Sequence, residues 1–452
     1  MISKLFKLLS TFGLTALGRV LGYGRDIVLA ALFGTSLISE LFVYAFRFQL
    51  FWRTLFVDQS IPAFLVPRLS QAPTFDEALQ SSLTTARRLA LGFALISVLI
   101  QPLAVLVMAR GFWIGPAETS GAVPPWMLAS LVGIGASLCF VGTVTSTVFI
   151  AGLQAKSRFR SAALVPLIFN IMLMLVVGAA ATVWVGTGAI LAVALTLSGG
   201  FLLAGLSQTW LAKWLFGPMA AKVEATTQKS KSFPSLTSEG SKQFAGIATL
   251  RLFEPLPLLL VSGLASVHAG YLTGFYFAER LTMLIPSILG LVVGAVLLTD
   301  LAKAANAGRR DQANRQYLLA AGATFAVAAV GAVCFALLSE LIIDVAFGRG
   351  AFEEESALLV QAFLAPLVWL IPFAALEYVV IQPFIIAKRT RLPIVLGATA
   401  TAVSFGWAMF ADGSPQAYAW ALCAPAICRI SILFGAGWFT LRANVQPATA
   451  AP

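Results

Sequence analysis

Apolar runs long enough to cross a lipid bilayer recur along the whole chain. Because an α-helix rises about 1.5 Å per residue, about 20 apolar residues span a hydrocarbon core about 30 Å thick. Of the 452 residues, 59% are hydrophobic and 11% are charged, whereas charged residues make up about a quarter of an ordinary soluble domain. The sequence therefore predicts an all-α polytopic membrane protein. We expect twelve spans, near residues 5–32, 37–66, 88–109, 125–152, 161–182, 187–211, 243–266, 270–300, 317–345, 356–386, 393–411 and 418–441.

Basic residues are distributed unequally between the two ends of these runs. If the N-terminus lies in the cytoplasm, nearly all lysines and arginines of the connecting segments face the cytoplasm, and the outer loops carry Arg110 and Arg349. This is the positive-inside pattern of membrane proteins. We therefore expect a multi-pass protein with both termini in the cytoplasm. The net charge of +11 follows from this bias and gives no reason to expect nucleic-acid binding.

Short segments recur at a fixed offset in the two halves of the chain. Tyr44–Arg47 resembles Tyr276–Arg280, and Ala155–Arg158 resembles Ala387–Thr390, each starting 232 residues later. Because this offset corresponds to six spans, an even number, both halves would share one orientation in the membrane. We expect an N-terminal six-helix lobe over 1–212, a cytoplasmic linker over 213–242, a C-terminal six-helix lobe over 243–442 and a short cytoplasmic tail over 443–452.

Seven arginines lie inside the apolar runs, namely Arg19, Arg25, Arg47, Arg53, Arg251, Arg280 and Arg429. A charged side chain at the bilayer centre costs about 2.5 to 3.5 kcal/mol on insertion scales, so such residues normally face a wet or protein-lined interior. In the first two runs the arginines outnumber the acids Asp26 and Asp58. This excess favours an anionic ligand, and the planar fork of arginine suits phosphate or pyrophosphate. The alternative is structural pairing with acids, which carries most weight for Arg251 beside Glu254 and for Arg429.

The N-terminal residues also carry a family resemblance. Gly18–Asp26 and Ala31–Gly34, followed by Arg53, resemble the N-terminal signature of the MurJ (MviN) family. Two later segments agree with it, Pro166–Asn170 and Tyr276–Arg280. This family of lipid II flippases belongs to the multidrug/oligosaccharidyl-lipid/polysaccharide exporter superfamily. The resemblance covers nearly the whole chain and is most specific in its first 70 residues.

The resemblance implies two six-helix lobes around a cationic cavity, and alternating access that moves a polyprenyl-pyrophosphate-linked saccharide from the inner to the outer leaflet. It implies a transporter rather than an enzyme, without a cofactor or metal and driven by membrane potential or an ion gradient. The expected partners are the lipid-linked saccharide, membrane lipids and cell-envelope biosynthesis enzymes, and the chain is expected to be monomeric. The candidate substrate-binding residues are Arg19, Arg25, Asp26, Arg47, Arg53, Asp58, Glu279 and Arg280. Glu254 and Glu377 are candidates for ion coupling.

The expected span count departs from the family pattern. Members typically have fourteen spans, whereas twelve are expected here, and the other two are thought to form a groove for the lipid tail. A flippase for another lipid-linked unit, of exopolysaccharide, capsule or O-antigen, is therefore an alternative. A cation-coupled multidrug exporter is a further one, although its cavity would favour carboxylates over arginines. Enzymatic readings are disfavoured because His268 is the only histidine and the sequence contains no P-loop.

Overall fold

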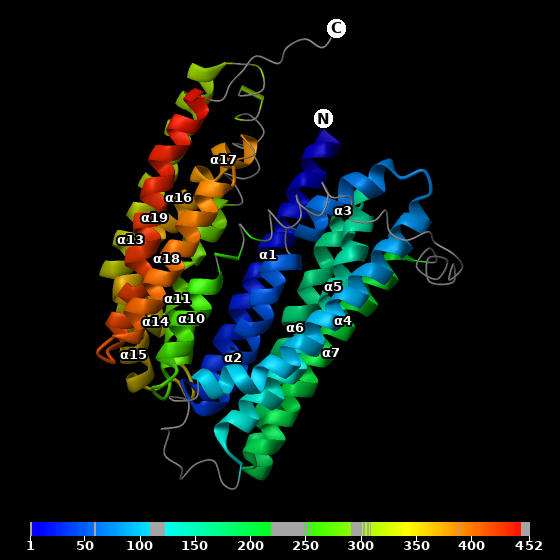
Figure 1. The fold of residues 1–452 in the computed structure, drawn as a ribbon. Coiled ribbons are helices and arrows are strands. Elements are labelled where there is room, and N and C mark those ends of the chain that lie inside the picture. Colours follow the sequence, from blue (N-terminus) through cyan, green and yellow to red (C-terminus); the bar gives the residue numbers. More distant parts are fainter. Residues whose placement is uncertain are drawn as a thin grey trace. The chain divides into compact units, whose positions relative to one another are not determined.

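The computed structural model describes residues 2–57, 60–108, 123–217, 249, 252–253, 255–290, 301, 303–304, 307, 309–387 and 389–443. Within these ranges every regular element is a helix, which confirms the predicted all-α class (Figure 1). Three residues singled out from the sequence, Asp58, Arg251 and Glu254, lie outside the described residues. Most of the predicted linker over 213–242 also lies outside them, so the predicted limits of the lobes remain predictions.

The chain divides into two compact units, which are described separately. The first unit comprises Met1–Pro255, Ser266–Gly270 and Arg349–Phe352, and the second comprises Leu256–Ala265, Tyr271–Gly348 and Glu353–Pro452. The helices of the first unit are α1 (Ile2–Phe33), α2 (Leu37–Trp52), the π-helical segment η1 (Arg53–Val57), α3 (Ser60–Gln71), α4 (Phe75–Met108), α5 (Pro125–Ala155), α6 (Phe159–Thr187) and α7 (Ile190–Phe216). Those of the second unit are α10 (Pro255–Ala265, of which Pro255 is counted with the first unit), α11 (Tyr271–Thr282), α13 (Arg310–Leu337), α14 (Ser339–Phe347), α15 (Glu354–Leu367), α16 (Leu370–Val380), α17 (Gln382–Ile386), α18 (Arg391–Met409) and α19 (Pro415–Ala443).

Several of these helices are long and apolar enough to cross a membrane. Seven meet that description among the described residues, and an eighth span results if the bent pair Glu354–Leu367 and Leu370–Ile386 is counted as one. The seven are Phe75–Leu99, Pro125–Ala155, Phe159–Thr187, Ile190–Phe216, Arg310–Leu337, Arg391–Met409 and Pro415–Arg442. The chain is therefore a multi-pass helical membrane protein, and the count of twelve spans remains a prediction.

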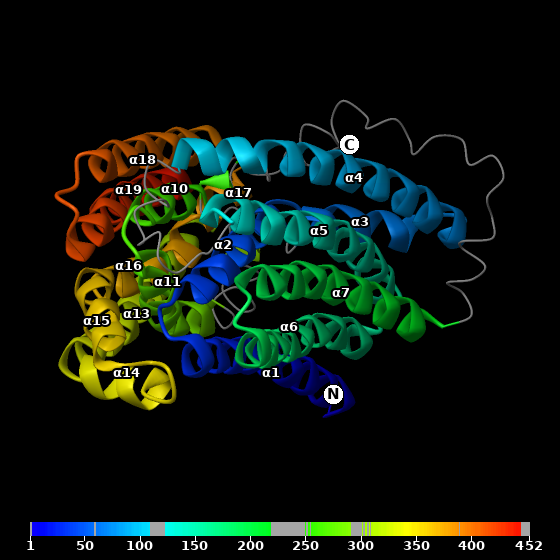
Figure 2. The same cartoon turned by 90° about the horizontal axis from the view of Figure 1, so that it is seen from below.

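In the first unit the helices pack in the order α4, α5, α7, α6 and α1, each against the next (Figure 2). Small residues permit the close approach of α5 and α7, because a Cβ added at Gly135 or Gly142 would collide with the backbone of α7. Side-chain hydroxyls join the same two helices. Ser198 donates to the carbonyl of Leu131 and Thr209 to that of Gly142, both at 2.8 Å. Small residues with hydroxyl donors are a common way to hold helices together inside a membrane.

In the second unit α13 packs against α16 and α19, and α11 packs against α15. The Tyr317 hydroxyl of α13 donates to the Phe434 carbonyl of α19 at 3.0 Å. A buried cluster that includes Tyr317, Val379, Phe384 and Leu433 fills the space between these helices. Each unit therefore has a hydrophobic interior of its own.

Several predicted spans are interrupted by breaks in the helix. The run near 37–66 consists of α2, η1 and α3, and the Ser60 hydroxyl donates to the Leu55 carbonyl at 2.8 Å next to the π-helical turn. The run near 317–345 is divided at Leu338, and the run near 356–386 bends by 49° after Leu367. Helix breaks inside membrane spans are tolerated where neighbouring groups satisfy the freed backbone. At η1 the residues Leu55 and Val57 are buried, so this irregular backbone lies inside the protein.

Candidate functional site

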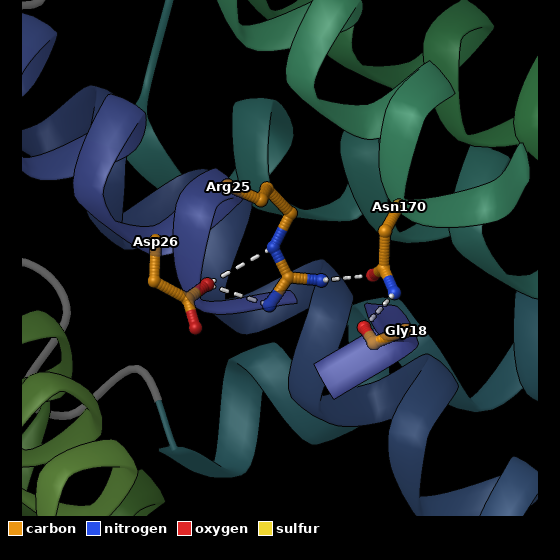
Figure 3. Close-up of polar contacts among 4 residues, drawn as sticks. All are labelled: Gly18, Arg25, Asp26 and Asn170. Carbon is orange, nitrogen blue, oxygen red and sulfur yellow. Dashed lines mark hydrogen bonds and ion pairs between the residues drawn. The ribbon is translucent and has the colours of Figure 1, made fainter. Parts of the chain in front are cut away.

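Arg25 of α1 is fully buried inside the first unit and makes several polar contacts (Figure 3). Its Nε and Nη2 atoms donate to Oδ1 of Asp26, at 2.9 and 2.6 Å. Its Nη1 atom points to Oδ1 of Asn170 on α6, at 3.5 Å, and Nδ2 of Asn170 donates to the Gly18 carbonyl at 3.1 Å. The guanidinium carbon lies 3.9 Å from the ring centre of Phe46 on α2. Arg25 thus connects three helices of one unit.

The burial of Arg25 requires compensation, because a charge removed from water is strongly destabilised unless it is paired and hydrogen-bonded. Asp26 is equally buried and supplies the opposite charge. The aromatic face of Phe46 adds a cation–π interaction, which is strongest where water is absent. Arg25 and Asp26 are therefore neutralised as a pair, and two N–H groups of the arginine fork are directed at one carboxylate oxygen.

Arg53 lies close to the same part of α6. It is the first residue of the π-helical segment η1, and its guanidinium carbon lies 5.7 Å from the ring centre of Phe169. Phe169 and Asn170 are consecutive, so neighbouring residues of α6 contact Arg53 and Arg25. Isolated π-helical turns occur often at functional sites, where they redirect a side chain. Arg25 and Arg53, two of the candidate substrate-binding residues, therefore contact consecutive residues of α6.

The remaining candidates of the first unit are less closely defined. Arg19 is half-buried and follows Gly18, whose carbonyl accepts from Asn170. Arg47 of α2 is 5% exposed and so lies within the protein. Asp58 is outside the described residues. The cationic group in this unit therefore centres on Arg25 and Arg53, with Arg19 on the same helix as Arg25.

The second unit contains the other candidates. Glu279 and Arg280 are half-buried on α11, and the guanidinium carbon of Arg280 lies 5.7 Å from the ring centre of Tyr276. Glu377 of α16 accepts a hydrogen bond from Nη2 of Arg429 on α19 at 2.6 Å. Arg429 therefore has an acidic partner, as the alternative of structural pairing requires. Glu377 is the carboxylate of that ion pair. The other coupling candidate, Glu254, lies outside the described residues.

Two parts of this arrangement were missed in the sequence. Pro166–Asn170 was noted for its resemblance, but neither Phe169 nor Asn170 was assigned a role. The available signal was Asn170 itself, an amide in the middle of an apolar run, where a polar group needs a hydrogen-bond partner. Nothing in the sequence spacing indicated that Glu377 would pair with Arg429.

The described residues contain no group of three or more His, Cys, Asp or Glu side chains placed to hold a metal ion. Arg25, paired with Asp26, and Arg53 both carry a guanidinium group, which can bind an anion by charge-assisted hydrogen bonds. The arrangement therefore suits anion recognition inside a helical unit.

Comparison with known proteins identifies the family. The family model of the lipid II flippase MurJ matches residues 29–445, a range that includes Arg53 and Arg280 and begins after Arg19 and Arg25. A relative from Rhizobium meliloti (strain 1021), named probable lipid II flippase MurJ, is 25% identical over 415 residues, covering 90% of this chain and 75% of the relative. A relative of the same name from Bdellovibrio bacteriovorus is 26% identical over 409 residues, covering 86% of this chain and 73% of the relative.

Solved structures show the same fold. The structure described as lipid II flippase MurJ in an inward closed conformation superposes with a TM-score of 0.74 at 18% identity, covering 98% of this chain and 90% of that one. An inward-facing multidrug resistance transporter of the MATE family and MOP superfamily superposes with a TM-score of 0.67 at 11% identity, covering 96% and 98%. At these identities the likeness concerns the fold alone. With the family model matched over most of its length, the chain belongs to the lipid II flippase MurJ family.

Proposed function

We propose that this protein is a flippase of the bacterial inner membrane that moves a lipid II-like, polyprenyl-pyrophosphate-linked saccharide from the inner to the outer leaflet by alternating access. The observation that carries the proposal is the buried group of Arg25, Asp26 and Asn170, with Arg53 beside Phe169, in a chain of the MurJ family. Relatives named probable lipid II flippase support this choice of substrate.

The contact between Arg25 and Asp26 suggests how an anion would bind. Two N–H groups of Arg25 converge on one carboxylate oxygen, which is the geometry that arginine also offers to a phosphate oxygen. A pyrophosphate group that entered the unit would replace the carboxylate of Asp26 at this fork. When the pyrophosphate leaves, Asp26 would neutralise Arg25 again. Asp26 thus acts as a resident anion that protects the empty site from an uncompensated buried charge.

Arg53 and Arg19 are proposed as further ligands of the phosphate groups. A pyrophosphate carries more negative charge than one guanidinium balances, so a single arginine is an incomplete site. Arg53 is the first residue of the π-helical segment η1 and contacts Phe169 of α6. Arg25 contacts Asn170, the next residue of α6, so both arginines adjoin the same part of this helix. Arg280, on the strength of the family resemblance, and Arg47, as a further arginine inside an apolar run, are also proposed to contribute to substrate binding.

Energy is proposed to come from the membrane potential or an ion gradient, without a cofactor. A membrane potential of 100 mV supplies a free energy of about 2.3 kcal/mol for each elementary charge that crosses the membrane. Glu377 is paired with Arg429, so its carboxylate is already neutralised by a protein cation. Glu377 and Glu279 are the two described candidates for a residue that couples transport to protons or another cation.

Translocation in proteoliposomes tests the proposal. Fluorescent lipid II in the outer leaflet can be bleached by a membrane-impermeant reductant, so transport appears as the fraction that becomes accessible. We expect Arg25→Lys, which keeps the charge and removes the fork, to reduce translocation by about tenfold or more, equivalent to one lost charge-assisted hydrogen bond.

The matched control for this experiment is Arg158→Lys, since Arg158 is exposed before α6. It should leave translocation unchanged. A second lipid that carries a different saccharide on the same pyrophosphate anchor separates a lipid II flippase from an exporter of another repeat unit. Normal translocation by a correctly folded Arg25→Lys variant would overturn the proposed role of Arg25.

A further inference from the structure

A cavity of about 140 Å³ lies in the first unit, where η1, α3, α4 and α5 meet. Four aromatic rings form much of its wall, those of Phe56, Phe64, Phe93 and Phe140. Ser82 is one of the few polar residues on the wall, and its hydroxyl donates to the Ala78 carbonyl of its own helix at 2.7 Å. The cavity therefore presents an almost purely hydrocarbon surface.

The walls of this cavity resist collapse because the aromatic rings support one another. The ring centres of Phe56 and Phe93 are 4.9 Å apart, and Trp52 stacks on Phe56 at 6.0 Å and lies 5.6 Å from Phe93. Apolar cavities of roughly 150 Å³ stay dry and accept benzene-sized hydrocarbons. A cavity of this size and lining is therefore suited to a segment of hydrocarbon chain rather than to water.

The cavity reaches the outer surface of α4. Ser82, Ala86, Leu89, Ala90 and Phe93 line it from one face of this helix, as expected for residues spaced three and four apart. Leu89 is 53% exposed, so the wall it forms borders the surroundings of the protein. The segment Phe75–Leu99 is apolar enough to span a membrane. In a bilayer the mouth of the cavity therefore faces lipid.

One cation contacts the wall of this cavity, and two others lie on the helix that lines it. The guanidinium carbon of Arg68 on α3 lies 3.7 Å from the ring centre of Phe64, which is part of the wall. Arg87 and Arg88 follow Ala86 on α4. The nearby acids Asp76 and Glu77 are in the first turn of α4, and Glu77 accepts a hydrogen bond from Thr74 at 2.9 Å. The positive-inside pattern places these arginines at the cytoplasmic face.

We propose that this cavity is a binding site for an anionic phospholipid of the cytoplasmic leaflet. One acyl chain enters between α3 and α4, and the phosphate lies beside Arg68 and the Arg87–Arg88 pair. Each basic residue near an anionic membrane surface favours such a headgroup. An unbranched acyl chain fits the small volume better than a methyl-branched prenyl chain, and bilayer phospholipid is present at the mouth at high local concentration. The site is separate from the arginines proposed to hold the transported pyrophosphate.

The first test counts phospholipids that remain bound to the full-length protein in native mass spectrometry. Phosphatidylglycerol and phosphatidylcholine with the same acyl chains serve as probes. Ala86→Leu fills the cavity, and Gly92→Leu is its matched control, because a Cβ at Gly92 on the same helix meets no atom within 4 Å. We expect phosphatidylglycerol to be retained in preference to phosphatidylcholine, Ala86→Leu to reduce that retention by about tenfold, and Gly92→Leu to leave it unchanged.

Two further experiments locate the headgroup and the acyl chain of the bound phospholipid. Arg68→Gln combined with Arg87→Gln should remove the preference for phosphatidylglycerol, whereas Arg158→Gln, an exposed arginine before α6, should not. Phosphatidylglycerol brominated along its acyl chain should quench the emission of Trp52, measured as the difference between the wild type and Trp52→Phe. This arm uses the unaltered cavity and so does not depend on whether Ala86→Leu folds.

The proposal is overturned by retention in Ala86→Leu equal to that in Gly92→Leu, by equal retention of the two phospholipids, or by an absence of Trp52 quenching. It is also overturned if polyprenyl phosphate displaces phosphatidylglycerol at equimolar concentration, because the site would then hold the transported lipid class.

Discussion

Each unit of the molecule contains a buried or half-buried arginine paired with a carboxylate, and the two pairs differ in almost every respect except length. The shortest N–O distance is 2.6 Å in both Arg25–Asp26 and Arg429–Glu377. The first pair joins neighbours in the sequence and its side chains are 1% and 0% exposed, whereas the second joins α19 to α16 and its side chains are 11% and 24% exposed. The first pair neutralises a charge within one helix, and the second links two helices.

The difference separates a site that can exchange its anion from a contact that holds helices together. Asp26 is on the same helix as Arg25, so an incoming phosphate can replace its carboxylate without separating helices. Replacing Glu377 would remove a connection between α16 and α19. Substitutions in the two pairs should therefore affect stability and transport differently.

Arg25→Ala is expected to have the largest effect. It deprives the fully buried carboxylate of Asp26 of the cation beside it, and removing one partner of a buried ion pair typically costs about 3 to 5 kcal/mol. It should also abolish lipid II translocation. The midpoint of thermal unfolding in detergent and the proteoliposome assay measure the two effects. Arg429→Ala is the matched comparison and should be less destabilising, and an equal or greater loss there would contradict the distinction.

Glu377→Gln should lower stability by about 1 to 3 kcal/mol, the value of a hydrogen bond to a charged group, and should leave the dependence of transport on the ion gradient intact. The reason is that Glu377 is already neutralised by Arg429. Translocation measured with and without an imposed gradient checks this. Loss of gradient dependence in Glu377→Gln, with Glu279→Gln unaffected, would assign ion coupling to the second pair.

Asn170→Ala removes the amide between Arg25 and the Gly18 carbonyl. We expect a loss of about 1 kcal/mol, typical of one net hydrogen bond, and slower translocation, because Arg25 loses its contact with the Asn170 amide of α6. Thermal unfolding and initial translocation rates measure these effects. Thr182→Ala, on the exposed part of the same helix, is the control. Translocation of Asn170→Ala at the wild-type rate would show that Asn170 does not position Arg25.

Asp412→Asn should have the smallest effect on stability. It removes an exposed carboxylate, for comparison with the carboxylates of the two ion pairs. Asp412 lies in the loop before α19, where hydrogen bonds from Ser414 hold the pKa of its carboxyl below the usual value. A carboxyl with a lowered pKa in the folded state stabilises at pH values above its unfolded pKa, and this contribution is lost as the pH falls through the folded pKa. The unfolding midpoints of the wild type and of Asp412→Asn should therefore differ slightly at neutral pH and converge in acid. A difference that grows in acid would contradict this.

The helices that run without a break were predicted closely. The run near 161–182 is α6 and the run near 418–441 is α19. The prediction for α4 was less accurate, since the helix begins at Phe75 rather than near residue 88. Arg87 and Arg88 stand at the beginning of the apolar run near 88–109, but arginine is compatible with a helix. Hydropathy therefore marks the membrane boundary and not the helix boundary.

The site was predictable in part for a related reason. Hydropathy singled out Arg25, Arg53 and Arg429 because a charge in an apolar run is costly. Their partners on other helices were not predictable, since Asn170 is 145 residues from Arg25 and Glu377 is 52 residues from Arg429. Contacts at such separations depend on how whole helices pack, which no local pattern records.

The most direct test of the account is the affinity of the purified protein for polyprenyl pyrophosphate, compared between the wild type, Arg25→Lys and Arg429→Lys. The exchange of Asp26 for phosphate at the arginine fork predicts that Arg25→Lys weakens binding by about tenfold or more, while Arg429→Lys binds like the wild type. Equal affinity of the wild type and Arg25→Lys, or a larger loss in Arg429→Lys, would contradict the central claim.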